Sequence, residues 1–257
     1  MKNITFLCGL PRSGNTLLAS LLNQNKNITA TPNSVVPDLL YESFRCKHTM
    51  TYQNFPDEIS LDKFCEKIIP AYYESFKSDF IIDRAPWGTP GNVMLLYKYF
   101  KQPLKFIVLT RPLIDIFISF IAIQGIKKKD TEKHIKKMLD KKHLLGMYIW
   151  SIQNLLKEAE VDKKIQLHFL NYDDLIKNPT KEIKEIYKFI GARYKKIKTT
   201  KLSQISVNGV GYNDAVYKVD YPKPFHIIRT NKIKKNFLDP KKYLPSEVIK
   251  VYRNYRI

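Results

Sequence analysis

A glycine-bounded loop, placed between an apolar run and a helix-like segment, constrains the fold of this chain more than any other feature. Residues 4–8 (ITFLC) are apolar and partly β-branched, which is typical of a buried strand. The loop Gly9–Thr16 (GLPRSGNT) follows directly, and apolar residues then recur at helical spacing as far as Gln24. Strand, loop and helix in this order form the context of the phosphate-binding pattern G-x-x-x-x-G-K-[ST].

The loop departs from that pattern at a position that carries chemistry. Gly9 and Gly14 permit a tight backbone path, and the amides at the helix start can bind an anionic oxygen group. The lysine that would grip a β- or γ-phosphate is replaced by Asn15, and the only fixed charge of the loop is Arg12. The loop therefore predicts an anion site that differs from the site of a nucleoside triphosphatase or a kinase.

Apolar runs alternate with helix-like segments along the rest of the chain. Further strands are expected at 80–82, 106–109 and 165–170, and helices at 36–46, 60–77, 91–100, after Arg111, 131–159, between Asn178 and Gly191, and at 246–255. Residues 199–230 are expected to form a loop. This alternation predicts a single domain, residues 1–257, with a three-layer α/β/α fold and a mostly parallel central sheet.

Polar and basic residues follow each of the four predicted strands. They are Arg12 to Thr16 after the first, Asp83 and Arg84 after the second, Arg111 after the third, and Tyr172 and Asp173 after the fourth. In parallel α/β sheets, ligands bind beyond the carboxyl ends of the strands. We therefore expect these side chains to gather at one site.

The charge balance is strongly basic, with 44 Lys and Arg against 24 Asp and Glu, a formal net charge of +20. Such a field attracts anions. Lysine-rich stretches at 127–142, 181–201 and 232–242 alternate with apolar residues, as solvated helix faces do. We therefore expect most of the lysines to be surface residues.

The remaining composition predicts a soluble, cytoplasmic protein. The cysteines Cys8, Cys46 and Cys65 are scattered without a C-x-x-C pair, so neither a disulfide framework nor a metal site is expected. No segment resembles a signal peptide. The longest apolar run, 113–123, contains Asp115 and is shorter than the roughly 20 residues of a membrane-spanning helix.

Residues 7–18 (LCGLPRSGNTLL) resemble the 5′-phosphosulfate loop of sulfotransferases, which use 3′-phosphoadenosine 5′-phosphosulfate (PAPS) as donor and release 3′-phosphoadenosine 5′-phosphate (PAP). The loop is most similar to the variant with Arg in place of Lys, as in tyrosylprotein sulfotransferases and their bacterial or viral relatives. The resemblance implies that Arg12 lies over the bridging oxygen. It also implies a 5′-phosphosulfate site made of Pro11, Arg12, Ser13, Gly14, Asn15 and Thr16.

Residues 106–112 (FIVLTRP), continuing to Ser119, resemble the 3′-phosphate motif of the same family. That motif is a strand, then an Arg, then a Ser eight residues later on a helix. Arg111, Asp115 and Ser119 stand four apart, which places them on one helical face. The resemblance implies that Arg111, as a planar fork, and Ser119 grip one phosphate.

Two further segments resemble the family less specifically. Residues 171–175 (NYDDL) with Asn178 and Pro179 are similar to a segment whose tyrosine, here Tyr172, contacts the nucleotide; a core tyrosine beside a helix cap is the alternative interpretation. Residues 226–229 (HIIR) resemble a C-terminal segment that closes over the nucleotide, which implies that Arg229 is a second 3′-phosphate ligand.

In-line sulfuryl transfer needs cations and positioned donors near the leaving oxygen. We expect Arg12 to stabilise the leaving group, and Arg84, which matches a basic position in related enzymes, to assist. The glutamate that serves as base in tyrosylprotein sulfotransferases falls at Asn33, which cannot act as a base. Asp83 is therefore our first candidate for the base, with an ion pair to a neighbouring Arg as its alternative role.

Other candidate residues follow from chemistry alone. His48, His143 and His226 are further candidates for the base, whereas His168 lies in a predicted strand and is expected to be structural. The acceptor pocket is expected at 33–60 and 120–150, with Asn33 and Ser34 on its wall. The aromatic candidates for an acceptor or adenine pocket are Tyr41, Phe44, Trp87 and Trp150, although aromatic side chains in a domain of this size more often belong to the core.

The predicted activity is transfer of a sulfuryl group from PAPS to a hydroxyl of a glycan, lipid, small alcohol or peptide. A P-loop kinase-like phosphotransferase is the first alternative, and it would need the lysine that Asn15 replaces. A basic nucleic-acid-binding protein is the second, and no motif of such proteins occurs in the sequence. We expect no specific nucleic-acid partner; the oligomeric state is left open.

Overall fold

The computed structural model describes residues 2–217, 225–229, 233–235, 238–253 and 255. Its centre is a sheet of five parallel strands in the order β2-β3-β1-β4-β5, which confirms the predicted parallel α/β fold. The strands are β1 (Asn3–Gly9), β2 (Ile28–Thr31), β3 (Phe80–Arg84), β4 (Lys105–Thr110) and β5 (Gln166–Asn171).

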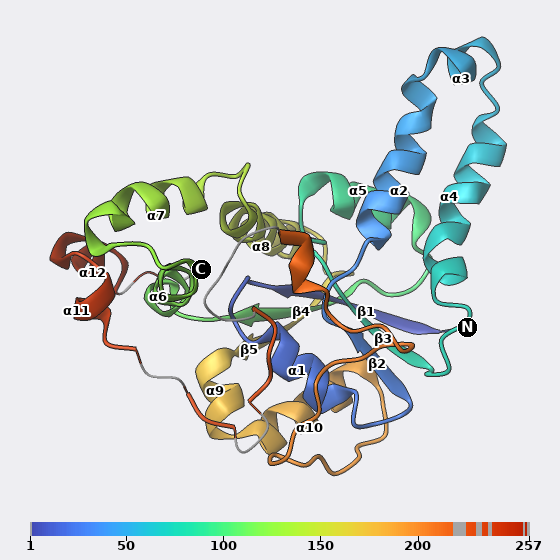
Figure 1. Ribbon diagram of the computed structural model, residues 1–257. Helices are drawn as coiled ribbons and strands as arrows, with labels where there is room; N and C mark the ends of the chain where they lie inside the picture. Colours follow the sequence, from blue (N-terminus) through green and yellow to red (C-terminus); the bar gives the residue numbers. More distant parts are fainter. Residues whose placement is uncertain (1, 218–224, 230–232, 236–237, 254, 256–257) are drawn as a thin grey trace.

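Helices cover both faces of this sheet, so that the molecule has three layers (Figure 1). The first face is covered by α1 (Asn15–Leu22), α9 (Tyr172–Lys177) and α10 (Pro179–Ile190). The elements over the second face and at the C-terminus are α5 (Pro90–Tyr99), α6 (Leu113–Gln124), η2 (Lys128–Asp130), α7 (Thr131–Leu139), α8 (Leu144–Val161), α11 (Pro240–Tyr243) and α12 (Ser246–Tyr252). A long hairpin of α2 (Val36–Arg45), η1 (Cys46–His48), α3 (Met50–Asn54) and α4 (Glu58–Tyr72) extends away from the sheet.

The alternation of side chains along β1 explains why the sheet has a core on each face. Phe6 and Cys8 point to the core beneath α5, α6 and α8, whereas Leu7 points to the core beneath α1 and α10. All three are fully buried, as expected for a central strand of a parallel sheet. The ring of Trp87 packs against Phe6 with 4.7 Å between centroids, so Trp87 belongs to the core.

Two of the differences between the structure and the predicted elements have a clear physical reason. Strand β2 was not predicted, because four residues are too short to show a period. The predicted helix 131–159 is two helices, α7 and α8, separated by a turn in which the backbone amide of Lys142 donates to Oδ1 of Asp140 (2.8 Å). An aspartate that binds the chain two residues on offers the backbone an alternative to the helix.

The C-terminal part contains less regular structure. Of the expected loop 199–230, residues 218–224 and 230 lie outside the described residues; the described part contains η3 (Asp214–Tyr217) and a single bridge between Val207 and Val210. The last predicted helix ends at Tyr252 rather than at 255, and residue 254 lies outside the described part.

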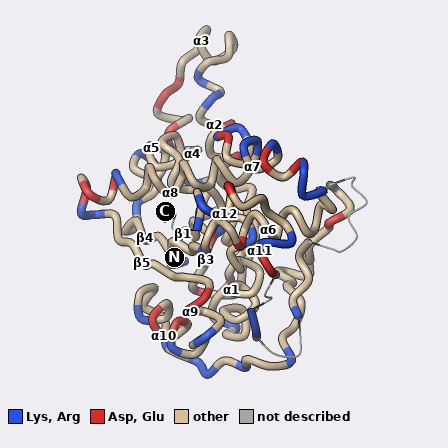
Figure 2. The backbone as a smooth tube through the Cα atoms, turned by 90° about the vertical axis from the view of Figure 1, so that its left-hand side faces the viewer, with Lys and Arg blue, Asp and Glu red and all other residues tan. Residues whose placement is uncertain are grey.

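The residues of the lysine-rich stretches lie mostly on the surface, as the sequence predicted. Figure 2 shows Lys and Arg positions along α7, α10 and the segment after α10, and most of these residues are exposed. None of the helices in the described residues has the length and apolar character needed to cross a bilayer.

Candidate active site

The loop after β1 has a strained backbone at its tip. Arg12 has φ 64° and Gly14 has φ 97°, both in the left-handed region, where only glycine is unstrained. The hydroxyl of Ser13 donates to the carbonyl of Leu10 (2.6 Å), and Nδ2 of Asn15 donates to the same carbonyl (2.7 Å). Ser13 and Asn15 therefore brace the loop from inside.

The side chain of Asn15 packs inside the loop. An added Cβ on Gly9 would lie 1.7 Å from Oδ1 of Asn15, so the amide packs directly against the first glycine of the loop. The backbone amides at the start of a helix favour an anion at this place. Pro11, Arg12, Gly14, Asn15 and Thr16 all line the cavity described below, whereas Ser13 is fully buried.

Gly14→Ala is expected to weaken anion binding and to destabilise the protein by about 1–3 kcal/mol. The φ of 97° is unfavourable for alanine, and the new Cβ would lie 2.7 Å from the ring of Tyr172. Chemical denaturation and PAP calorimetry measure the two effects. Gly125→Ala, which also has positive φ but no heavy atom within 4 Å of the added Cβ, is the matched control for the backbone term. Equal losses in both variants would contradict the proposed contact with Tyr172.

Arg12 reaches from the loop to two other parts of the chain. Its Nε donates to Oγ of Ser119 on α6 (3.1 Å), and its Nη1 donates to the carbonyl of Phe225 (2.7 Å). Burial, reinforced by the neighbouring charge of Arg111, lowers the pKa of Arg12. An arginine nevertheless stays protonated at physiological pH, so Arg12 places a desolvated positive charge at the centre of the site.

Arg111 stands at the end of β4, just before α6, and is fixed from three directions. Its Nη1 donates to the carbonyl of Arg12 (2.9 Å), and its guanidinium lies over the ring of Tyr172, with 4.3 Å from Cζ to the centroid. Its Nε pairs with Oδ2 of Asp115 (3.7 Å). Arg111 and Ser119 line the same cavity, but the hydrogen bond of Ser119 is to Arg12 rather than to Arg111.

Arg84 approaches the loop from the other side, at the end of β3. Its Nη2 donates to the carbonyl of Gly9 (3.3 Å), and its Nη1 donates to Oδ1 of Asn33 (3.2 Å). Its guanidinium lies 4.5 Å from the centroid of the buried Tyr148 ring. The end of β3 therefore brings a second cation to the loop that carries Arg12. This cation contacts Asn33, the position at which the base of tyrosylprotein sulfotransferases falls.

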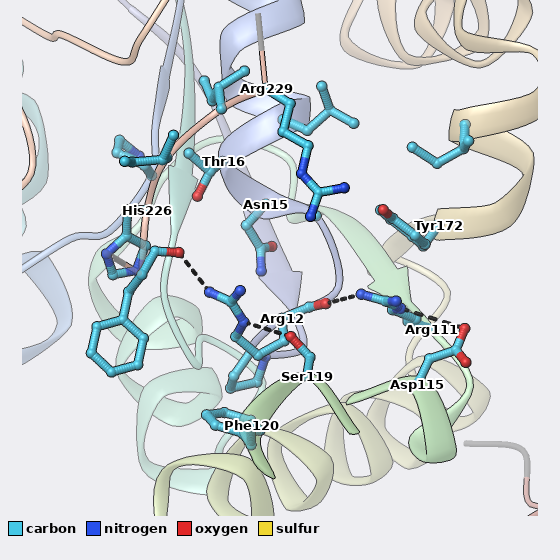
Figure 3. Close-up of a pocket in the computed structure, with 18 of the residues that line it drawn as sticks. Arg12, Asn15, Thr16, Arg111, Asp115, Ser119, Phe120, Tyr172, His226 and Arg229 are labelled. Carbon is cyan, nitrogen blue, oxygen red and sulfur yellow. Dashed lines mark hydrogen bonds and ion pairs between the residues drawn. The ribbon is translucent and has the colours of Figure 1, made fainter. Parts of the chain in front are cut away.

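These residues surround a cavity of about 460 Å³ at the carboxyl ends of the strands (Figure 3). Four arginines (Arg12, Arg84, Arg111 and Arg229) and Lys234 line it, and Asp115 is the only carboxylate among the described residues of its wall. The Nε atoms of Arg84 and Arg111 are buried with no hydrogen-bond acceptor among the described residues. The wall therefore fits a ligand with several negative charges.

Asp83 does not lie on this wall. It is fully buried, and its carboxylate accepts hydrogen bonds from Oγ1 of Thr31 and Nε1 of Trp87, both at 2.9 Å. Burial raises the pKa of Asp83, and these hydrogen bonds oppose the increase. Its position behind the cavity favours a structural role for Asp83. Its partners are the Thr31 hydroxyl and the Trp87 indole, and not the arginine of the ion pair considered from the sequence.

Asp83→Asn is therefore expected to keep turnover within about threefold of the wild type and to cost about 1–3 kcal/mol of stability, because one buried partner loses its acceptor. If Asp83 were the general base, its loss would lower turnover by roughly 10²–10⁴-fold. Turnover of PAPS and thermal unfolding measure the two quantities. A loss of turnover above a hundredfold in a folded variant would restore Asp83 as the base.

Residues 225–229 and 233–234 of the C-terminal segment line one side of the cavity. Arg229 points toward the space beside Tyr172 (Figure 3), and Lys235 pairs with Oδ2 of Asp115 (2.9 Å) and Oδ1 of Asp173 (2.8 Å). The sequence did not indicate Lys235, because its two partners lie on separate elements. These ion pairs tie the segment to α6 and α9.

His226 lies on the same segment and is held by residues that the sequence did not indicate. Its Nδ1 is 2.6 Å from Oδ1 of Asp214, and its ring stacks on Tyr212 with 3.8 Å between centroids. The other candidate histidines are elsewhere: His48 is exposed on η1, His143 precedes α8, and His168 lies in β5, where it stacks on Phe189. Of these four histidines, only His226 lines the cavity.

Residues 2–255 match the family model described as the sulfotransferase domain. The sulfotransferase domain of the olefin synthase from Synechococcus PCC 7002 is 18% identical, with a TM-score of 0.54 and coverage of 91% of this chain and 92% of that chain. The sulfotransferase domain from the curacin biosynthetic pathway is 16% identical, with a TM-score of 0.52 and coverage of 76% and 75%. A sulfotransferase from Alicyclobacillus acidocaldarius is 13% identical, with a TM-score of 0.50 and coverage of 77% and 83%. No curated protein matches the chain.

Proposed function

The chain belongs to the sulfotransferase domain family and is a PAPS-dependent enzyme, and we propose that the arginine-lined cavity is where it binds PAPS and transfers the sulfuryl group to an acceptor hydroxyl. The observation that carries this proposal is the placement of Arg12 and Arg111 on one cavity wall, joined by the hydrogen bond from Nη1 of Arg111 to the carbonyl of Arg12. The loop between β1 and α1 and the unit formed by β4 and α6 thus contribute to the binding of one ligand.

The donor side of the cavity extends from the loop to Arg111. Gly14, Thr16 and the amides at the start of α1 would hold the 5′-phosphosulfate. Arg111, Ser119 and Arg229 would hold the 3′-phosphate, and Tyr172 would position the nucleotide while it supports Arg111. PAPS supplies the activated sulfuryl group; Arg12, at the centre of this wall, stabilises the charge that develops on the leaving oxygen.

The acceptor side lies beyond Arg12. Arg84, Asn33 and Tyr212 line this part, and Phe120 and Leu144 add apolar surface. Arg84 is placed to assist Arg12, because both guanidinium groups contact the loop or its neighbours. The chemistry requires an acceptor hydroxyl, and a glycan, lipid, small alcohol or peptide meets that requirement.

Three finer predictions accompany this proposal. Arg12 in the loop supports a relationship with the tyrosylprotein-sulfotransferase-like members. The free cysteines Cys8, Cys46 and Cys65 support a cytoplasmic location. One cavity built from both halves of the chain supports a single domain over residues 1–257.

Calorimetry with PAP, ATP and adenosine 5′-monophosphate tests the donor site. We expect PAP to bind without added Mg²⁺ and more tightly than both other nucleotides, because only PAP carries the 3′-phosphate that Arg111 would meet. Mg²⁺-dependent binding with a preference for ATP would contradict the proposal and favour the P-loop phosphotransferase.

A further inference from the structure

Neither Asn33, where the base of related enzymes falls, nor Asp83, the first candidate from the sequence, presents a basic group to the acceptor side of the cavity. Asn33 has no basic group and accepts a hydrogen bond from Arg84, and the carboxylate of Asp83 is buried behind the wall. A hydroxyl acceptor nevertheless has to lose its proton during transfer. The base must therefore come from another segment that reaches this part of the cavity.

The segment around His226 reaches it from the C-terminal side. Tyr212, on which the His226 ring stacks at an interplanar angle of 4°, donates its hydroxyl to the carbonyl of Pro32 (3.2 Å), next to Asn33. The carbonyl of the preceding residue, Phe225, accepts the hydrogen bond from Nη1 of Arg12 (2.7 Å). His226 thus lines the cavity near Arg12 (Figure 3), and its stacking partner Tyr212 contacts the residue that precedes Asn33.

Asp214 fixes the ring and its tautomer. Oδ1 of Asp214 lies 2.6 Å from Nδ1 of His226, and Oδ2 accepts the backbone amides of Phe225 (2.9 Å) and His226 (3.2 Å). Burial acts to raise the pKa of Asp214, but its hydrogen bonds and the proximity of His226 outweigh that effect and lower it. An ionised Asp214 accepts the proton of Nδ1–H, which makes Nε2 the basic nitrogen of the neutral ring.

The charges around the ring favour its neutral form. Burial lowers the pKa of His226, Asp214 opposes this, and the cationic side chains of Arg12 and Arg84 lower the pKa further. Among the described residues, the titratable side chain of Tyr212 also contacts the ring, on which it stacks. The ring is therefore deprotonated at neutral pH, as a base has to be.

We propose that His226, oriented by Asp214 and Tyr212, is the general base of the transfer. In this step the acceptor O–H bond breaks and its proton moves to Nε2, while the acceptor oxygen forms a bond to sulfur. The bond between sulfur and the bridging phosphate oxygen breaks, and its electron pair stays on the 5′-phosphate of PAP beside Arg12. The imidazolium then releases the proton to solvent. This assignment rests on the proposed donor site.

The test compares His226→Gln with His48→Gln, a histidine that is exposed on the distant hairpin. The readout is PAPS consumption in a mixture of phenol, hexanol, N-acetylglucosamine and water, measured from pH 5 to 9, with PAP calorimetry on each variant. We expect the turnover of His226→Gln to be roughly 10²–10⁴-fold lower than that of the wild type. The decrease in rate that the wild type shows at acid pH should be absent from this variant. Its affinity for PAP should stay within about threefold of the wild-type value. Asp214→Asn should lower turnover, and the double variant should be no slower than His226→Gln, because the two residues act as a unit.

Nitrogen-15 NMR of the wild type without donor gives a readout that does not depend on turnover. We expect the neutral Nδ1–H tautomer of His226 at pH 7, and its loss in Asp214→Asn. An Nε2–H tautomer, or His226→Gln turnover within threefold of the wild type, would overturn the assignment while leaving the donor site in place. A wild type that neither binds PAP nor consumes PAPS would instead contradict the proposed function, and the assignment would fall with it.

Discussion

Arg12→Ala is expected to lower turnover by about 10²–10³-fold, because the loss of one preorganised hydrogen-bond donor to a developing oxyanion lowers the rate of an enzyme by about this factor. The partly buried guanidinium of Arg12 is held by Ser119 and the Phe225 carbonyl, so in the proposed mechanism it would meet the leaving oxygen without reorganising. Single-turnover consumption of PAPS measures the chemical step apart from binding.

Arg12→Lys separates charge from geometry, because lysine keeps the charge but cannot contact Ser119 and the Phe225 carbonyl as a planar fork. We expect it to recover only part of the loss. Arg45→Ala, which removes an exposed arginine paired with Glu42 on α2, is the matched control and should leave turnover unchanged. If Arg12→Ala and Arg45→Ala had equal turnover, Arg12 would have no part in the chemistry.

Arg111→Ala is expected to weaken PAP binding by about 10- to 100-fold, the equivalent of about 1.5–3 kcal/mol for a hydrogen bond to a charged group. Part of any loss could arise through the loop, because Nη1 of Arg111 also holds the carbonyl of Arg12. Adenosine 5′-monophosphate separates the two effects, since it lacks the 3′-phosphate.

In calorimetry, the variant should lose affinity for PAP but retain most of its affinity for adenosine 5′-monophosphate, so that the preference for PAP disappears. Arg193→Ala, which removes an exposed arginine after α10, is the control. Equal losses for both nucleotides would show that Arg111 acts on the loop rather than on the 3′-phosphate.

The sequence predicted the parts of the site that depend on local structure. The loop between β1 and α1 and Arg111 at the end of β4 could be found because each lies where a strand ends, and parallel strands bring these ends together. For Asp83, the position at a strand end does not bring the carboxylate to the cavity wall. Its place at a strand end is correct, but side chains alternate along a strand, and the carboxylate points into the core with Trp87.

Contacts between distant segments could not be predicted in this way. Ser119 accepts a hydrogen bond from Arg12 of a separate element, and Arg111 precedes α6, which begins at Leu113, so Arg111 does not lie on the helical face expected from the spacing. The pairing of His226 with Asp214 joins two residues outside the regular helices and strands of the sheet, and no periodic pattern in the sequence predicts such a contact.

Transfer of label from [³⁵S]PAPS tests the central claim most directly. The account predicts that the wild type, without added Mg²⁺, moves the label to an acceptor hydroxyl or to water and releases one PAP for each sulfuryl group, and that Arg12→Ala abolishes most of this transfer. Two results would contradict it. One is undiminished transfer by Arg12→Ala, and the other is that PAPS stays intact while the protein transfers phosphate from ATP in the presence of Mg²⁺.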